Sequence, residues 1–229
     1  MHRPGRIAID GPAGAGKSTV GEQLARKLGY LYIDTGAMYR AVAWLALREG
    51  VSVDDGPALA RLAQRAEIAI LHPHVDDGRQ YTVTVDGQDV TWDIRNTAVT
   101  RAVPPVSAHP DVRAILIARQ REMAYRQDGI VMVGRDIGAV VLPDAELKIY
   151  LTATVQERAR RRYAELEERL GKDNPALPSL DDVLADIERR DEIDKDHSAP
   201  AHDAIVIMSD NLSVEQVMEL IESLVEDTP

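Results

Sequence analysis

The sequence predicts a doubly wound α/β fold, in which helices cover both faces of a parallel sheet. Apolar runs typical of buried strands recur along the chain, at residues 6–10, 30–34, 130–134, 146–152 and 204–208. Stretches with helical character lie between or after them, at residues 18–28, 37–48, 154–170, 180–191 and 213–224. Strands that alternate with helices in this way need the crossover connections of a parallel sheet, so the α/β class follows.

Local signals mark where these elements begin and end. Gly50 is expected to end the helix over 37–48, and Ser213 is expected to cap the N-terminus of the last helix. Proline-containing segments at 171–179 and 195–203 are predicted to be loops.

Residues 66–92 interrupt the alternation of strands and helices. The stretch 81–92 alternates apolar and polar residues around Asp86-Gly87, a dipeptide typical of the turn of a β-hairpin. We therefore expect an inserted antiparallel subdomain within the α/β fold.

Composition restricts the chemistry and the partners. The 229 residues are 45% hydrophobic, contain no cysteine and carry a formal net charge of −11. Disulfides, cysteine-bound metals and thiol catalysis are excluded, and an acidic chain is expected to repel nucleic acid polymers and anionic membranes. No apolar run approaches the roughly 18 residues of a membrane span, and the N-terminus does not resemble a signal peptide, so we expect a cytoplasmic protein.

Arginines cluster at 113–126 and 158–162, where they either bind a small phosphorylated ligand or form ion pairs on helix surfaces.

A glycine-rich segment between the first strand and the first helix matches the P-loop pattern G-x-x-x-x-G-K-[ST]. Backbone N–H groups and the helix dipole there can hold the phosphates of a nucleoside triphosphate. Lys17 would reach the β- and γ-phosphates, and the Ser18 hydroxyl would bind Mg²⁺. The alternative is a structural strand-to-helix turn with an exposed lysine. The residues expected to bind the nucleotide are Gly11, Pro12, Ala13, Gly14, Ala15, Gly16, Lys17, Ser18 and Thr19.

The segment 34–40 is a candidate site for the phosphate acceptor. It follows the second predicted strand and offers hydroxyl groups and an arginine where α/β proteins bind ligands. Alternatively, Thr35 only caps the following helix and Tyr39 packs within it. An N-K-x-D tetrapeptide is absent from the sequence, which argues against a GTPase.

Several blocks resemble the bacterial cytidylate kinase family, in the order and spacing of that family. They are IAIDGPAGAGKST, YIDTGAMYRAVAWLAL, DIRNTAV, HPDVRAILIARQR, GRDIGAVVLPDAELKIYLTA and ERRDEIDKD. The resemblance implies a monomeric P-loop nucleoside monophosphate kinase with three parts. The core would comprise 1–36, 129–153 and 202–229, the monophosphate-binding region with its insert about 37–128, and a helical lid about 154–200.

The same resemblance implies an activity and the residues that support it. The chain would transfer the γ-phosphate of ATP to CMP or dCMP with Mg²⁺. The implied acceptor contacts are Thr35, Tyr39, Arg40, Arg113, Arg135, Asp136 and Asp194. The implied lid arginines are Arg158, Arg161 and Arg162, with Arg190 from the following helix. Catalysis is assigned to Lys17, Arg135, Arg158, Arg162 and Arg190.

Three positions depart from the family pattern. Val133 replaces an acidic residue before Gly-Arg-Asp, Pro104 replaces a serine, and His197 replaces an arginine three residues after Asp194. They leave two other interpretations open: a kinase of another small acceptor, and a nucleotide-binding protein whose acceptor site has decayed.

Overall fold

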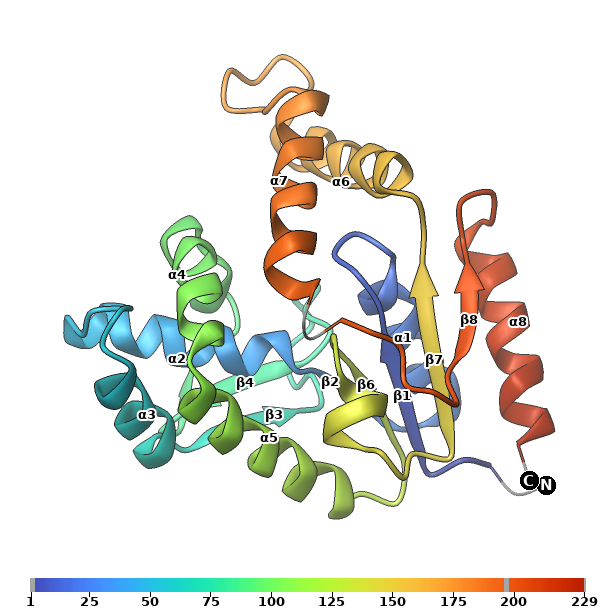
Figure 1. Ribbon diagram of the computed structural model, residues 1–229, viewed down its shortest axis with the longest axis horizontal. Helices are drawn as coiled ribbons and strands as arrows, with labels where there is room; N and C mark the ends of the chain where they lie inside the picture. The colour runs from blue at the N-terminus through green and yellow to red at the C-terminus, as the bar shows by residue number, and fades with distance from the viewer. Residues whose placement is uncertain (1–2, 196–197, 229) are drawn as a thin grey trace. The chain divides into compact units, whose positions relative to one another are not determined.

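The computed structural model describes residues 3–195 and 198–228 of the chain (Figure 1). The strands are β1 (Arg6–Asp10), β2 (Leu31–Asp34), β3 (Ile68–Leu71), β4 (Thr82–Val85), β5 (Gln88–Asp89), β6 (Ile130–Val133), β7 (Leu147–Thr152) and β8 (Ile205–Met208). The helices are α1 (Lys17–Leu28), α2 (Gly36–Glu49), α3 (Gly56–Arg65), α4 (Thr97–Ala108), α5 (Pro110–Tyr125), α6 (Val155–Leu170), α7 (Leu180–Asp194) and α8 (Val214–Asp227). The described residues also include the 3₁₀ turn η1 (Asp93–Arg95) and the π-type turn η2 (Ile137–Val141). In these described residues, no helix is long and apolar enough to cross a membrane.

The predicted parallel sheet is confirmed. Five strands form it in the order β2-β6-β1-β7-β8. Strand β1 pairs in parallel with β7, with Ile7 opposite Leu147, and β7 pairs in parallel with β8 (Figure 1). All four residues of β6 and the last four of β1 are buried, which explains why both are continuous apolar runs rather than alternating ones.

Internal contacts divide the chain into two units. The P-loop unit comprises residues 1–24 and 133–229, and the insert unit comprises residues 25–132. The P-loop unit contains the glycine-rich loop and helices α6 and α7, which pack on each other through Ala159, Val183 and Ile187. The insert unit contains the segment 34–40 and the antiparallel strands.

The predicted hairpin is confirmed within the insert unit. Strands β3, β4 and β5 form an antiparallel sheet, in which Thr84 lies opposite Asp89 and Val85 opposite Gln88. Asp86 and Gly87 have φ angles of 51° and 78°, as the two central residues of a tight hairpin turn require.

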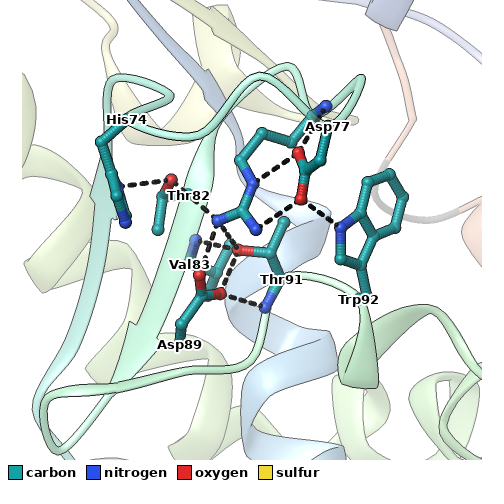
Figure 2. A network of polar contacts seen from close by, with 8 residues as sticks. His74, Asp77, Thr82, Val83, Asp89, Thr91 and Trp92 are labelled. Carbon is teal, nitrogen blue, oxygen red and sulfur yellow. Dashed lines mark hydrogen bonds and ion pairs between the residues drawn. The ribbon is translucent and has the colours of Figure 1, made fainter.

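A polar cluster around Arg79 holds the loop 72–80 against this hairpin (Figure 2). The Arg79 guanidinium pairs with Asp77 at 2.7 Å and with Asp89 at 2.6 Å, and Asp77 also accepts a hydrogen bond from the indole of Trp92. The hydrogen bond from Arg79, assisted by one from Thr91, lowers the pKa of Asp89 to about 2. The loop is therefore tied to its neighbours by ionised groups.

Helices α3, α4 and α5 were not assigned from the sequence. Helix α4 contains Pro104 and Pro105 in its interior, where proline removes a hydrogen-bond donor and ordinarily interrupts a helix. Helix α5 buries Val112, Leu116 and Gln120 along one stripe, and the polar Gln120 obscures the apolar repeat. Packing of α4 on α2 and of α5 on α3 overrides these unfavourable local signals.

Candidate active site

The P-loop adopts a conformation that only glycine tolerates at several positions. Gly11, Gly14 and Gly16 have φ angles of +146°, +76° and +92°. A Cβ atom on Gly11 would lie 1.9 Å from the carbonyl oxygen of Leu151 in β7. Helix α1 starts at Lys17, so the N-terminus of this helix, which favours anions, directly follows the loop. The sequence thus produces a strand–loop–helix segment of the kind that favours anion binding.

Lys17 is largely enclosed, with 8% of its surface exposed. Its Nζ donates a hydrogen bond of 2.7 Å to the carbonyl oxygen of Pro12, across the loop. The ammonium group therefore lies over the glycine-rich segment rather than in open solvent, which argues against the structural interpretation of this motif.

Arg135 connects the Gly-Arg-Asp-Ile-Gly block to the P-loop. Its Nη1 donates to the carbonyl oxygen of Gly11 at 2.9 Å, and its Nε pairs with Asp194 at the end of α7 at 2.7 Å. Arg135, predicted to bind the acceptor, thus links the first residue of the loop predicted to bind the donor to Asp194, a second predicted acceptor residue.

Arg158 also reaches the P-loop, but its guanidinium is enclosed, with 5% of the residue exposed. It donates to the carbonyl oxygens of Ala153 and Ala13, at 3.0 and 3.1 Å, and forms a two-pronged pair with Asp191 of α7. These bonds engage most of its donors, so in this structure Arg158 fastens the P-loop to α6 and α7.

The remaining predicted arginines of α6 and α7 bond elsewhere. Arg162 pairs with Glu165 at 2.9 Å and Arg190 with Asp186 at 2.8 Å, both within their own helix and partly exposed. Arg161 bonds to Glu157 and to Ser209. The hydrogen bond from Arg160, followed by that from Arg161, lowers the pKa of Glu157 to about 2. The partners of these three predicted arginines thus lie outside the P-loop.

Two acidic residues lie close to the P-loop in the same unit. Asp136, predicted to contact the acceptor, precedes η2 and is 9% exposed. Asp10, at the end of β1, was not predicted as a site residue, yet it is 3% exposed and accepts two backbone hydrogen bonds from η2. Burial raises the pKa of Asp10, and the two hydrogen bonds oppose that rise. The only signal in the sequence was an acidic residue ending an otherwise apolar strand.

The other predicted acceptor residues lie in the insert unit. Thr35 precedes α2 and is buried, but its side chain makes no capping hydrogen bond to that helix. Tyr39 lies in α2, and Arg113 lies in the first turn of α5. Arg40 donates to the carbonyl oxygen of Ile94 at 3.2 Å and to the Thr100 hydroxyl at 3.0 Å, which joins α2 to η1 and α4.

The three family departures have different settings. Val133 ends β6 and is buried, with 1% of its surface exposed. Pro104 lies inside α4, where its carbonyl accepts from the Ser107 hydroxyl. His197 lies outside the described residues.

The residues present fit a magnesium ion that accompanies a nucleotide. Among residues 3–195 and 198–228 there is no cluster of three or more His, Cys, Asp or Glu side chains that could hold a metal by itself. Mg²⁺ bound with nucleotides takes few protein ligands and several phosphate oxygens and waters. Ser18, in the first turn of α1, fits the role of a single protein ligand.

Comparison with known proteins assigns the family. The profile of the family described as cytidylate kinase matches residues 7–227. The chain belongs to the cytidylate kinase family. The resemblance deduced from the sequence blocks is thereby confirmed.

Relatives in the cytidylate kinase family match over nearly the full length. A protein of Roseiflexus castenholzii named cytidylate kinase is 50% identical over 99% of this chain and 96% of its own length. A cytidylate kinase of Chloroflexus aggregans is 49% identical over 96% of this chain and 94% of its own length. A bifunctional pantoate ligase/cytidylate kinase of Synechocystis is 50% identical over 97% of this chain, which covers 43% of that longer protein.

Proposed function

We propose that this chain transfers the γ-phosphate of ATP to CMP or dCMP, forming ADP and CDP or dCDP, with Mg²⁺ present. The observation that carries the proposal is the hydrogen bond between Arg135, in the family's Gly-Arg-Asp-Ile-Gly block, and the carbonyl oxygen of Gly11 in the P-loop. That bond brings a guanidinium group to the loop that would hold the donor. The names of the cytidylate kinase relatives support the choice of acceptor.

The proposed reaction needs no covalent intermediate with the protein. A phosphate oxygen of CMP attacks the γ-phosphorus in line, and the bond to the β–γ bridging oxygen breaks to release ADP. The N–H groups of the P-loop and the start of α1 hold the donor phosphates. Lys17 and Arg135 neutralise oxygen charge that develops during transfer. Mg²⁺, with Ser18 as its protein ligand, would supply further charge neutralisation at the β- and γ-phosphates.

The proposed acceptor contacts combine a phosphate site and a base site. Thr35, Tyr39, Arg40 and Arg113 are assigned to the acceptor on the strength of the family pattern. Asp136 and Asp194 would read the cytosine and the sugar. A carboxylate accepts from the exocyclic amine of cytosine, whereas uracil offers a carbonyl there and leaves the site mispaired.

The ion pairs of α6 and α7 separate two proposed roles for arginine. The Arg162–Glu165 and Arg190–Asp186 pairs are partly exposed, and such pairs contribute only about 0–1 kcal/mol. A nucleotide phosphate can therefore replace the carboxylate at little cost. The buried two-pronged pair of Arg158 would exchange far less readily, so its proposed contribution is to hold the P-loop in shape.

We also propose the three-part division of core, monophosphate-binding region and lid, over the ranges given above. Closure of a lid over about 154–200 would exclude water that otherwise hydrolyses ATP. The proposal extends to a cytoplasmic monomer, which cell fractionation and light scattering of the purified chain would test.

An acceptor screen tests the proposed activity. Purified protein, ATP and Mg²⁺ are combined in turn with CMP, dCMP, UMP, AMP, shikimate and gluconate, and ADP formation is followed. Turnover of CMP and dCMP should exceed that of UMP, and CMP-dependent ADP formation should far exceed the ATPase background measured without an acceptor. Equal turnover of UMP and AMP would remove the cytosine assignment, while faster turnover of another acceptor would reassign the kinase.

A nucleotide-binding protein without transferase activity is the second candidate. It is favoured by Val133 and Pro104, which replace polar residues of the family pattern. It requires ATP binding in calorimetry without ADP formation from any acceptor. Val133→Asp or Pro104→Ser should then restore transfer to CMP.

A further inference from the structure

Asp10 stands where the central sheet meets the P-loop. It is the last residue of β1 and immediately precedes Gly11. A carboxylate at such a buried position costs free energy unless its oxygens are satisfied by donors. Asp10 is 3% exposed, so its partners must come from the protein.

Both carboxylate oxygens of Asp10 accept hydrogen bonds from the backbone of η2. Oδ1 accepts from the N–H of Ile137 at 2.8 Å, and Oδ2 accepts from the N–H of Gly138 at 2.7 Å. These are the first two residues of the turn, and the Asp136 side chain that precedes them makes no capping bond. Asp10 therefore caps η2 from a different part of the chain.

The hydrogen bonds of Asp10 belong to a wider attachment between two segments. The N–H of Gly134 donates to the carbonyl oxygen of Ile9 at 3.1 Å, and Arg135 donates to that of Gly11 at 2.9 Å. Three consecutive residues, 9–11, thus hold the block 134–138 at its start, its middle and its end. Arg135 and Asp136 lie between the backbone attachment at 134 and the two attachments made by Asp10.

The other side of η2 lies close to β7. A Cβ atom on Gly138 would lie 3.2 Å from the Lys148 side chain of that strand. Burial raises the pKa of Asp10, with the neighbouring Asp136 adding to the rise, while the two backbone hydrogen bonds and Lys17 lower it. The surroundings of Asp10 therefore penalise its charge, and the two backbone hydrogen bonds offset part of that penalty.

We propose that Asp10 is a positioning residue for phosphoryl transfer, whose carboxylate sets the distance between the P-loop and the Arg135–Asp136 pair. The inference rests on the proposed function, in which the loop holds ATP and this pair contacts the acceptor. Asp10 touches neither substrate in this scheme. It acts by fixing the backbone on both sides of the transfer.

Asp10→Asn is the decisive variant because it preserves the shape and removes one of the two acceptors. Its amide nitrogen would face a backbone N–H, leaving either Ile137 or Gly138 without a partner. A displacement of about 1 Å can reduce transfer about 100-fold. We expect kcat to fall and the KM for CMP to rise by about tenfold or more, while the KM for ATP changes less than about threefold.

Ser213→Ala is the matched control for lost stability. Ser213 caps α8 in the same unit, and removing a cap destabilises a protein without touching this site. The KM values of Ser213→Ala for CMP and for ATP should both stay at wild-type levels. If Asp10→Asn lowers only the melting temperature, or changes both KM values equally, the positioning role is overturned. If that variant does not purify, Asp10→Glu, which keeps both acceptor oxygens but moves them by one methylene group, should show the same difference between the two KM values.

Amide hydrogen exchange separates this inference from the proposed activity. Peptides covering 134–142 should exchange faster in Asp10→Asn than in the wild type, and at the wild-type rate in Ser213→Ala. If the wild-type chain uses another acceptor, the KM for that acceptor should rise in Asp10→Asn while the KM for ATP changes little. If the wild-type chain transfers phosphate to no acceptor, unchanged amide exchange over 134–142 in Asp10→Asn would by itself overturn the structural role of Asp10.

Discussion

Gly11→Ala should damage both the stability of the chain and its nucleotide site. The added methyl group would lie 1.9 Å from the carbonyl oxygen of Leu151 and 3.0 Å from its carbonyl carbon. Strand β7 would have to retreat by about 1 Å before the contact reached even a tight 3.0 Å. That retreat is opposed on both sides, because β7 is paired with β1 and with β8.

The magnitude follows from two costs. Gly11 has φ +146°, where an L-residue is strained by about 1–3 kcal/mol. Overpacking against a strand adds typically about 1–3 kcal/mol. A total of about 2–6 kcal/mol would lower the melting temperature of a chain of this size by at least about 4 °C, and by about 8–16 °C at the middle of that range. The affinity for ADP should also fall, because the shifted residue begins the P-loop.

Gly50→Ala provides the control for backbone strain alone. Gly50 ends α2 with φ 69° and ψ 24°, and a Cβ atom added to it would meet nothing within 4 Å. Only the left-handed conformation is penalised, by about 1 kcal/mol, which corresponds to about 2–4 °C. Calorimetric melting and ADP titration of both variants make the comparison. A Gly11→Ala variant that melts no lower than Gly50→Ala and binds ADP as tightly as the wild type would contradict this expectation.

Three further predictions concern charge. Lys17→Ala should abolish transfer and leave the melting temperature within a few degrees of the wild type; near-normal turnover would remove Lys17 from the proposed mechanism. Arg113→Ala should raise the KM for CMP more than that for ATP, and an equal effect on both would place it outside the acceptor site. In the hairpin, the bond from Arg79 holds the pKa of Asp89 at about 2, below its ordinary value of 3.8. A carboxyl group whose pKa is lowered by folding stabilises the folded protein at pH values above its ordinary pKa. That stabilisation is lost as the pH falls through the pKa of the folded state. The protection of amides in the loop 72–80, relative to their intrinsic exchange rate at each pH, should therefore fall between about pH 4 and pH 2. Arg79→Gln should weaken that pH dependence; identical profiles would contradict it.

Elements with strong local signals were predicted well from the sequence. The turn at Asp86-Gly87, the helix stop at Gly50 and the cap at Ser213 all lie where their residue types require them. Each depends on the φ preference or side-chain bond of a residue only a few positions away. The P-loop belongs to the same class, because its glycines, lysine and following helix are contiguous.

Elements that depend on distant partners were not predictable in this way. Helix α4 forms despite Pro104 and Pro105, because its packing compensates for the missing donors. Similarly, nothing near Arg158 in the sequence distinguishes it from Arg162. Arg158 pairs with Asp191, which lies 33 residues away in the chain, whereas Arg162 pairs with Glu165 on the surface of its own helix.

The sequence by itself determined the fold class, the nucleotide-binding loop and, through its blocks, the cytidylate kinase family. Only the tertiary structure decided which charged groups meet. Asp10 reaches η2 across 127 and 128 residues of chain, and Arg135 reaches Gly11 across 124. The physical reason is that backbone preferences act over a few residues, whereas a buried carboxylate or guanidinium takes its partners from whatever segments the packed sheet brings beside it.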